Sequence, residues 1–367
     1  MVELEGGHIG RGLGVVHLPS RTPYVRKLHC EDFHIVNGTQ LPSGDTVPTT
    51  VNADWLLAHR PLQWLDVLHL HHVEFEDIES LGRLLDACTA DGIRVVFTAH
   101  DVEPMFTGED ELSARLRLLA SADVRWIGLT PGSVSAVREL VDTPVPITVI
   151  PHGYVAAPEA LADRQRTQQS QARRYLMFGA SRPNRDFVST LVNWSLGTAD
   201  PDARLQLLLR AFSPADFADP NGRVAQLISA ARSDPRVRLT MRPYPSDDEV
   251  IDAGLGADTV LLPYLWGSHS GQLELAFDLD LLPVCSDVGY LREQYEPHKG
   301  LVTEPEWFDW PRQNPYLFGE QFLAALERAT DRPVSGVRHH NTDFIEHRRD
   351  EHQRIIAAHS RVYGGDP

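Results

Sequence analysis

The strongest constraint on the fold is an alternation of two periodicities along most of the chain. Short apolar runs rich in β-branched residues, typical of buried strands, alternate with segments whose apolar side chains fall on one face of a helix. In the first half, strands are expected over residues 13–18, 67–70, 95–98, 126–129 and 148–150, and helices over 78–88, 111–122 and 133–140. Strands that alternate with helices indicate βαβ units and a parallel sheet.

The alternation stops at a polar, Gln- and Arg-rich stretch and then begins again. Residues 156–174 have no apolar period, which is typical of a linker. Strands are expected again over residues 175–178, 205–209, 237–240, 260–262 and 283–285. We therefore expect two α/β domains, residues 1–155 and 175–340, joined by the linker 156–174, and a C-terminal helix over 341–363 that packs back on the first domain.

The composition excludes several classes of protein. The 367 residues are enough for two domains of ~150 residues, and 42% hydrophobic residues allow a sizeable core. The 51 acidic and 34 basic residues give a net charge of −17, which argues against broad nucleic-acid binding. Three distant cysteines indicate no disulfide framework, and from the residues given we expect neither a secretory signal nor a membrane span. We expect a cytoplasmic protein.

Histidines and carboxylates follow the expected strands of the first half. Ligands of open parallel sheets bind beyond the carboxyl ends of the strands, so the site is expected in a cleft between two facing sheets. The side chains that stand at these ends are His69, His71, His72 and Glu74, then His100 and Asp101, and finally His152 and Tyr154.

Two segments of the second half are suited to an anionic ligand. Gly179 ends a strand, where it permits close backbone approach, and Arg182 and Arg185 follow with positive charge. Ser268, His269, Ser270 and Gly271 precede a helix whose N-terminus favours an anion. Glu274 lies about one turn into that helix, where a carboxylate suits ribose hydroxyls. The nearby pair Asp278 and Asp280 is interpreted as a solvated helix face.

These segments, in this order, resemble the GT-B glycosyltransferases, and within them the retaining glycosyltransferase family 4. Residues 95–101 (VVFTAHD) resemble the family's strand ending in T-x-H-D, and 147–154 (ITVIPHGY) its V-I-P-N-G-V. Residues 178–185 (FGASRPNR) are similar to F-G-x-x-R-P-x-K, with Arg185 in the lysine place. Glu274 matches the second glutamate of the family's spaced pair, whereas Trp266 occupies the place of the first.

The resemblance implies two Rossmann-like domains and transfer of a hexose from a nucleotide-diphosphate donor with retention of configuration. Arg182, Arg185 and the loop 268–271 would stabilise the leaving diphosphate, Glu274 would bind the ribose, and His100 and Asp101 would line the reacting centre. No cofactor or metal is implied, and UDP precedes GDP on family prevalence. The acceptor is expected to be a small molecule, such as a natural-product intermediate, near His71, His72, Glu74, His152 and Tyr154.

Three other interpretations remain open. His69-x-His71 at a strand end is the pattern with which metal-dependent hydrolases bind a divalent ion, and it predicts a single (β/α)8 barrel. The missing first glutamate is compatible with a GT-B protein that has lost catalysis and now activates or scaffolds a partner. A GT-B sugar epimerase is a third possibility, distinguished by whether the sugar reaches an acceptor.

Overall fold

The computed structural model describes residues 12–20, 22–41, 44–141, 143–162, 172–180, 182–210, 212–332 and 342–365. The chain divides into two compact units. Unit 1 comprises Met1–Gly153 and Asp350–Pro367, and unit 2 comprises Tyr154–Arg349. No helix within the described ranges is both long and apolar enough to cross a membrane. The three cysteines, Cys30, Cys88 and Cys285, are free.

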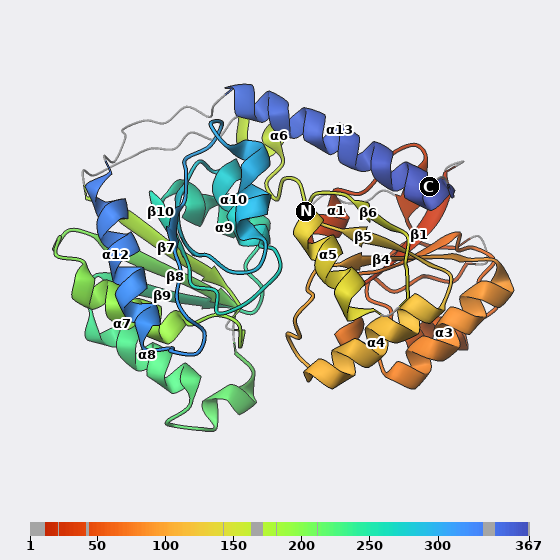
Figure 1. Ribbon diagram of the computed structural model, residues 1–367, viewed down its shortest axis with the longest axis horizontal. Helices are drawn as coiled ribbons and strands as arrows, with labels where there is room; N and C mark the ends of the chain where they lie inside the picture. The colour runs from red at the N-terminus through yellow and green to blue at the C-terminus, as the bar shows by residue number, and fades with distance from the viewer. Residues whose placement is uncertain are drawn as a thin grey trace. The chain divides into compact units, whose positions relative to one another are not determined.

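Unit 1 is built on a six-stranded, all-parallel sheet in the order β2-β1-β3-β4-β5-β6 (Figure 1). Its strands are β1 Leu13–Leu18, β2 Phe33–Ile35, β3 Val67–Leu70, β4 Arg94–Ala99, β5 Val124–Gly128 and β6 Ile147–Val149. Its helical segments are α1 Pro23–Arg26, α2 Ala53–Ala58, η1 Val73–Phe75, α3 Ile78–Asp91, α4 Glu109–Ser121 and α5 Pro131–Leu140.

Alternate residues of the unit 1 strands enter two separate cores, because successive side chains point to opposite faces of a sheet. On β1, Val16 and Leu18 join the large core with α3 and α4. Val15 instead joins a smaller core that includes Tyr363, from the end of the C-terminal helix α13 (Thr342–Gly364). Both faces are therefore buried, as parallel sheets require.

Unit 2 repeats the architecture with the order β12-β11-β10-β7-β8-β9, again all parallel. The strands are β7 Arg174–Gly179, β8 Arg204–Arg210, β9 Val237–Arg242, β10 Thr259–Leu262, β11 Leu282–Ser286 and β12 Glu306–Phe308. The helical segments are α6 Pro158–Ala162, α7 Phe187–Gly197, η2 Pro214–Phe217, α8 Arg223–Ser233, α9 Asp247–Leu255, α10 Gly271–Asp278, α11 Leu291–Tyr295, η3 Glu296–His298 and α12 Leu317–Asp331.

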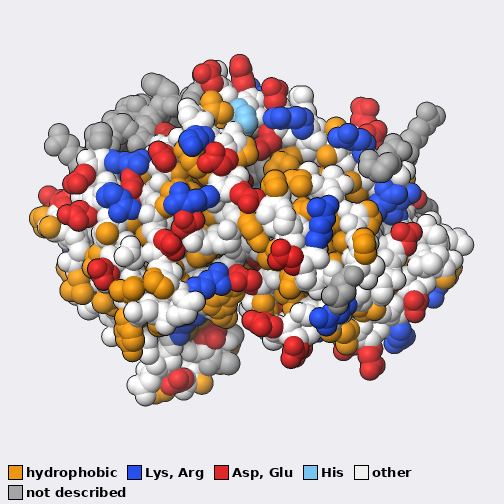
Figure 2. Space-filling view, in the orientation of Figure 1, with side chains coloured by type: hydrophobic (Ala, Val, Ile, Leu, Met, Phe, Trp, Pro, Cys, Tyr) orange, Lys and Arg blue, Asp and Glu red, His pale blue; other side chains and the backbone are white. Residues whose placement is uncertain are grey.

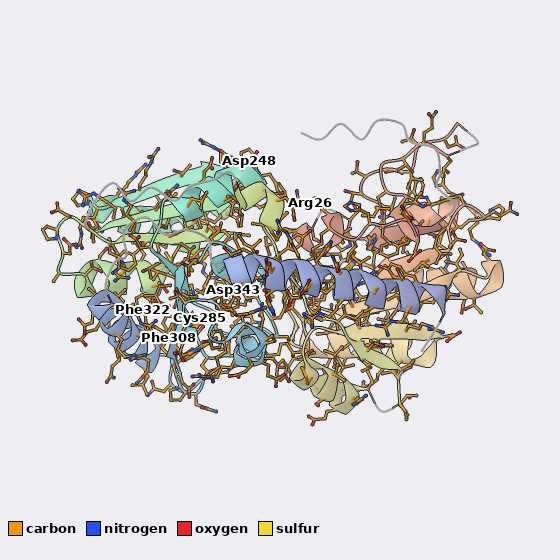
Figure 3. All side chains as sticks on the ribbon, turned by 90° about the horizontal axis from the view of Figure 1, so that it is seen from above. Arg26, Asp248, Cys285, Phe308, Phe322 and Asp343 are labelled. Carbon is orange, nitrogen blue, oxygen red and sulfur yellow. The ribbon has the colours of Figure 1, made fainter. Side chains whose placement is uncertain are left out.

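The unit 2 sheet is also covered on both faces. Tyr175 and Met177 of β7 pack in one core with helices α7, α8 and α12, where the rings of Phe308 and Phe322 lie with centroids 5.7 Å apart (Figure 3). Leu176 and Phe178 enter the opposite core with α9 and α10. The alternation of β7 between two cores explains its continuous apolar sequence.

Both sheets contain a switch point, where consecutive connections leave a strand in opposite directions. In unit 1 the chain passes from β1 to β2 on one side and then to β3 on the other. In unit 2 it passes from β7 to β8 and β9, and later to β10 on the other side of β7. Ligands of such sheets bind at the carboxyl ends of the strands that flank this point.

The predicted α/β class with two parallel sheets is confirmed. The metal-hydrolase alternative is wrong in its fold, because the described residues form two six-stranded sheets and not one barrel. The short edge strands β2 and β12 were not predicted. Within the expected linker, residues 158–162 form α6, and residues 163–171 lie outside the described residues.

Candidate functional site

The switch point of unit 2 is held together by two loops that pair with each other. The loop after β7 and the loop after β10 form a bridge between Arg185 and Tyr264. The backbone of Leu265 donates to Asn184 O at 2.8 Å, and that of Asp186 donates to Pro263 O at 3.1 Å. The two predicted anion segments therefore belong to one site.

Gly179 ends β7 at this point and leaves no room for a side chain. Its φ is +102°, and a Cβ there would lie 2.7 Å from Gln272 Nε2 and 2.9 Å from Arg185 Nη1. Gln272 is fixed between the two loops, because its Nε2 donates to Phe178 O at 2.5 Å and its Oε1 accepts from the Tyr264 hydroxyl at 3.1 Å.

Arg185 is half-buried over the ring of Tyr264, with its Cζ 5.1 Å from the ring centroid. Its Nη1 donates to Ala180 O at 3.3 Å and its Nη2 to the Tyr264 hydroxyl at 3.5 Å. Its Nε is buried and has no hydrogen-bond partner among the described residues. Arg223 donates hydrogen bonds to the carbonyls of Arg182 and Arg185 and so stabilises this loop.

The loop before α10 packs so closely against residue 289 that only glycine fits there. Gly289 has φ +53°, and a Cβ there would lie 1.8 Å from Gly267 O. Ser268 and Ser270 are buried, while His269 and Gly271 are half-buried. Ser270 caps α10 by accepting from Leu273 N at 3.0 Å, and its own hydroxyl is 2.6 Å from that of Tyr264.

Glu274 lies in a buried ion pair. Arg348 of α13 donates from Nη2 to Glu274 Oε2 at 2.5 Å, and Gln294 Nε2 donates to Oε1 at 2.8 Å. Only 2% of the Glu274 surface is exposed. Both carboxylate oxygens therefore have protein partners, and the ribose contact inferred from the resemblance stays a prediction.

The interpretation of Asp278 as part of a solvated face is wrong. Its side chain is buried, accepts from Arg348 Nε at 2.9 Å and accepts from the backbone of Val155 and Ala156 at 2.7 and 3.0 Å. Glu274 and Asp278 are four residues apart and share one face of α10, which allows a single guanidinium to bridge them. Asp280 accepts from the Thr303 hydroxyl at 2.9 Å.

The switch point of unit 1 carries a chain of buried imidazoles. His17 and His69 are paired in register on β1 and β3. His17 Nδ1 and His71 Nε2 are hydrogen-bonded at 2.9 Å, and His71 Nδ1 and His100 Nε2 at 3.1 Å. His72 stacks on His100 with ring centroids 5.1 Å apart. Asp101, the next residue after His100, is half-buried.

Burial keeps these imidazoles neutral, because charging them requires desolvation. It lowers the pKa of His17 to about 3, with a further lowering from nearby His359. Burial likewise lowers the pKa of His69 and His71 well below the ordinary value, and neighbouring histidines add to it. His71 is only 1% exposed, so it contacts His100 and not solvent.

Neutral imidazoles are suitable metal ligands, and one nitrogen each of His17, His69 and His71 lies within 4.8 Å of the others. The hydrogen bonds use these nitrogens differently. His17 and His71 are hydrogen-bonded to each other, while His69 is hydrogen-bonded to the Tyr363 hydroxyl at 2.6 Å and to Thr98 Oγ1 at 2.7 Å. A metal at this point would have to displace several of these hydrogen bonds.

Glu74 binds the loop after β4. Its Oε1 accepts from the backbone of Phe106 and Thr107 at 2.9 and 3.0 Å, and from the Thr107 hydroxyl at 2.8 Å. It also accepts from Met105 N at 3.1 Å. The Glu74 carboxylate therefore stabilises the loop after β4, a structural role that the sequence did not indicate.

His152 and Tyr154 follow β6 in the sequence. His152 is buried beside Tyr24, with ring centroids 5.2 Å apart, and its carbonyl accepts from Lys27 Nζ. Tyr154 is half-buried in unit 2, where burial, together with Glu159 and Asp278, raises its pKa to about 12. The two predicted acceptor-side residues thus belong to different units.

The structure brings together His71, His72 and His100 in unit 1, and Gly179, Arg185 and Ser270 in unit 2. It adds residues that sequence reasoning missed: His17, Tyr24, Tyr264, Gln272, Gln294 and Arg348. His17 had a signal, because it is the next-to-last residue of an expected strand, as is His69. Gln294 and Arg348 had none, since their partners lie 20 and 74 residues away.

Comparison with known proteins identifies similar structures but no similar sequence. The sequence matches no protein-family model and no curated protein. The structure is similar to sucrose-phosphate synthase from Thermosynechococcus elongatus, with 14% identity, a TM-score of 0.64, and coverage of 96% of this chain and 98% of that one. It is also similar to Anabaena HepE in complex with UDP, with 12% identity, a TM-score of 0.60, and coverage of 95% and 99%.

A third similar structure is a UDP-forming α,α-trehalose-phosphate synthase from Burkholderia xenovorans in complex with glucose 6-phosphate. The identity is 12%, the TM-score is 0.57, and the match covers 84% of this chain and 74% of that chain. At such identities the likeness shows the fold, so the chain has the GT-B fold with two Rossmann-like units. The assignment to family 4 stays a prediction.

Proposed function

We propose that the protein is a retaining glycosyltransferase that moves a hexose from a nucleotide-diphosphate donor to a small-molecule acceptor. The observation that carries the proposal is the unit 2 switch point, where Arg185 keeps a buried Nε without a partner among the described residues. The positive end of α10 begins at Gly271, seven residues after Tyr264, and the Tyr264 hydroxyl contacts both Arg185 and the N-cap residue Ser270. Guanidinium and helix N-terminus together suit a diphosphate.

The mechanism follows from the charge that develops as the diphosphate leaves. Arg182, Arg185 and the loop 268–271 would stabilise that charge, which is the kind of electrostatic contribution that dominates catalysis. The acceptor hydroxyl would attack on the face from which the diphosphate departs and pass its proton to the departing phosphate. His100 and Asp101 would contact the donor sugar and acceptor. The scheme uses neither a metal nor a cofactor.

We further propose UDP as the donor nucleotide, ahead of GDP. HepE, one of the similar structures, was solved with UDP, and the trehalose-phosphate synthase is described as UDP-forming.

The experiment is calorimetric titration of the protein with UDP, GDP, ADP and TDP, with and without EDTA. Arg185→Ala should weaken binding of the preferred nucleotide by about 1–3 kcal/mol, the scale of a lost hydrogen bond to a charged group. Arg242→Ala is the matched control, because Arg242 is an exposed unit 2 arginine paired with Glu249. Equal affinity in both variants would contradict the donor site.

The alternative of a non-catalytic GT-B protein has two observations in its favour. Trp266 stands in the place of the first glutamate, and the carboxylate of Glu274 is bound by Arg348 and Gln294. Donor turnover separates the two functions. A transferase releases nucleoside diphosphate from a UDP-sugar faster when acceptor is added, whereas a nucleotide-binding scaffold would bind UDP and release none.

A further inference from the structure

Two large aromatic side chains are exposed together in unit 1. Phe75 is 57% exposed and Phe106 is 45% exposed, and their ring centroids lie 4.8 Å apart with a tilt of 39°. Phe75 ends η1, shortly after β3, and Phe106 stands in the loop after β4. These two loops follow neighbouring strands of one parallel sheet, at the edge where its ligands bind.

The position of Phe106 is fixed by its backbone. Glu74, the residue before Phe75, accepts hydrogen bonds from the consecutive amides of Met105, Phe106 and Thr107. Met105 is buried beside Phe106. One carboxylate thus attaches the β4 loop to η1 and holds two phenyl rings against each other in water. Such an arrangement exposes apolar surface without contributing to a core.

The ring of His72 connects the Phe75–Phe106 pair to His100 at the expected reacting centre. The ring of His72 lies 6.0 Å from that of Phe75 and 5.1 Å from that of His100. Phe106, Phe75, His72 and His100 therefore form a row of rings, which we call the aromatic strip. It runs from exposed phenyl groups to the 6% exposed imidazole of His100.

We propose that the aromatic strip binds an apolar aglycone of the acceptor, with the hydroxyl that receives the sugar toward His100. This inference rests on the proposed function and names the substrate class of the same site. Phenyl rings offer no hydrogen bond, so the hydroxyls of a sugar-phosphate acceptor would lose water there without replacement. An aromatic or aliphatic group instead gains contact and loses unfavourable hydration. Two rings are also too small a surface for a stable protein partner.

The test uses 2-naphthol as the probe of an apolar acceptor and glucose 6-phosphate as the probe of a sugar phosphate. Binding of each to the full chain is measured by saturation-transfer NMR and calorimetry, without nucleotide. Phe75→Ala and Phe106→Ala should each weaken naphthol binding about tenfold, or ~1.4 kcal/mol. Glu74→Gln should weaken it too, because the β4 loop loses its attachment. Tyr316→Ala is the control, since Tyr316 is a 91% exposed aromatic residue in unit 2.

Folding is checked by the thermal unfolding of each variant. Phe75→Ala, Phe106→Ala and Tyr316→Ala change exposed side chains and should leave the melting temperature unchanged, whereas Glu74→Gln should lower it and still unfold in one cooperative transition. The proposal is overturned if naphthol does not bind, if it binds all variants equally, or if Tyr316→Ala weakens it as much. Preferential binding of glucose 6-phosphate at the strip also overturns it. If no nucleotide binds while the naphthol pattern holds, the transferase proposal fails and the apolar subsite stands.

Discussion

His17 shows how strongly a single residue depends on its surroundings in this fold. It is fully buried, its Nε2 has no partner among the described residues, and its Nδ1 is hydrogen-bonded to His71. Burial lowers the pKa of His17 to about 3 and that of His359, on α13, to about 4. Both imidazoles are therefore neutral in the folded protein at neutral pH.

The lowered pKa values predict acid sensitivity. Above the ordinary histidine pKa of 6.5, both histidines are neutral in the folded and in the unfolded protein, so they do not change the free energy of unfolding. Below it the unfolded state binds protons that the folded state does not. Each histidine then removes about 1.4 kcal/mol of unfolding free energy per pH unit, until the folded pKa is reached. Urea unfolding at about pH 7, 6 and 5 measures this slope.

A histidine variant identifies the source of the slope. His359→Gln should unfold with a shallower pH dependence than the unaltered protein, whereas replacement of the exposed His29 by Gln should leave the slope as it is. A slope that is the same in all three proteins would assign the acid sensitivity to other groups.

Gly289 predicts a second effect at the residue scale. A Cβ at this position would lie 1.8 Å from Gly267 O, and φ is +53°. Gly289→Ala should therefore displace the loop before α10 and lower the unfolding free energy by about 3 kcal/mol or more. Gly300→Ala is the matched control, because Gly300 also has a positive φ, +82°, but a Cβ there would have no atom within 4 Å. This substitution should lower the unfolding free energy by only about 1–2 kcal/mol. Similar losses measured by chemical denaturation would show that the contact with Gly267 is unimportant.

At the scale of elements, α10 joins the candidate anion site to α13. Its N-terminus carries Ser270 at the β7/β10 switch point, while Glu274 and Asp278 on its buried face bind Arg348. The pKa of His298, which also contacts Arg348, is lowered to about 2 by burial and by that guanidinium. One arginine therefore compensates two buried carboxylates beside a neutral imidazole.

Arg348→Met should be strongly destabilising, because it leaves Glu274 and Asp278 buried without their cation. The expected loss is about 3–5 kcal/mol. Arg349→Met is the adjacent control, since Arg349 forms an exposed pair with Glu159 and its loss should cost less than about 1 kcal/mol. Thermal unfolding of the two variants makes the comparison. Equal melting temperatures would mean that the buried pair contributes no more than the exposed one.

At the scale of the whole molecule, the C-terminal segment completes a core that begins near the N-terminus. Residues from Asp350 onward belong to unit 1. Ile355, Val362 and Tyr363 pack with Val15 and Phe33, and the Tyr363 hydroxyl is hydrogen-bonded to His69 Nδ1 at 2.6 Å. On the face that Figure 2 shows, acidic and basic side chains are interspersed.

Tyr363 tests this long-range support. Tyr363→Ala should lower the stability of unit 1 by about 3–5 kcal/mol, the scale of a large aromatic deletion from a core. Tyr363→Phe should cost about 1 kcal/mol, because it removes only the hydrogen bond to His69. Arg361→Ala, on the exposed side of the same helix, is the control. Calorimetry that finds all three alike would show that the C-terminal helix adds little to the unit 1 core.

Much of the architecture was predictable because periodicity is a local property. The strand over residues 13–18, the last helix and the restart near residue 175 follow from which side chains alternate and which recur on one face. The location of the candidate sites at strand ends follows from parallel topology alone. The edge strands Phe33–Ile35 and Glu306–Phe308 were missed, since three residues carry too little periodic signal.

Which side chains meet was decided by packing between distant segments. The ribose contact of Glu274 stays a prediction, and nothing in the sequence indicated that Arg348, 74 residues later, would bind its carboxylate. Glu74 read as an acceptor-side residue, and the structure gives it the amides of the β4 loop. A sequence specifies the face that each segment buries. The partner of a buried charge depends on register, crossover and helix packing, which exist only in the folded chain.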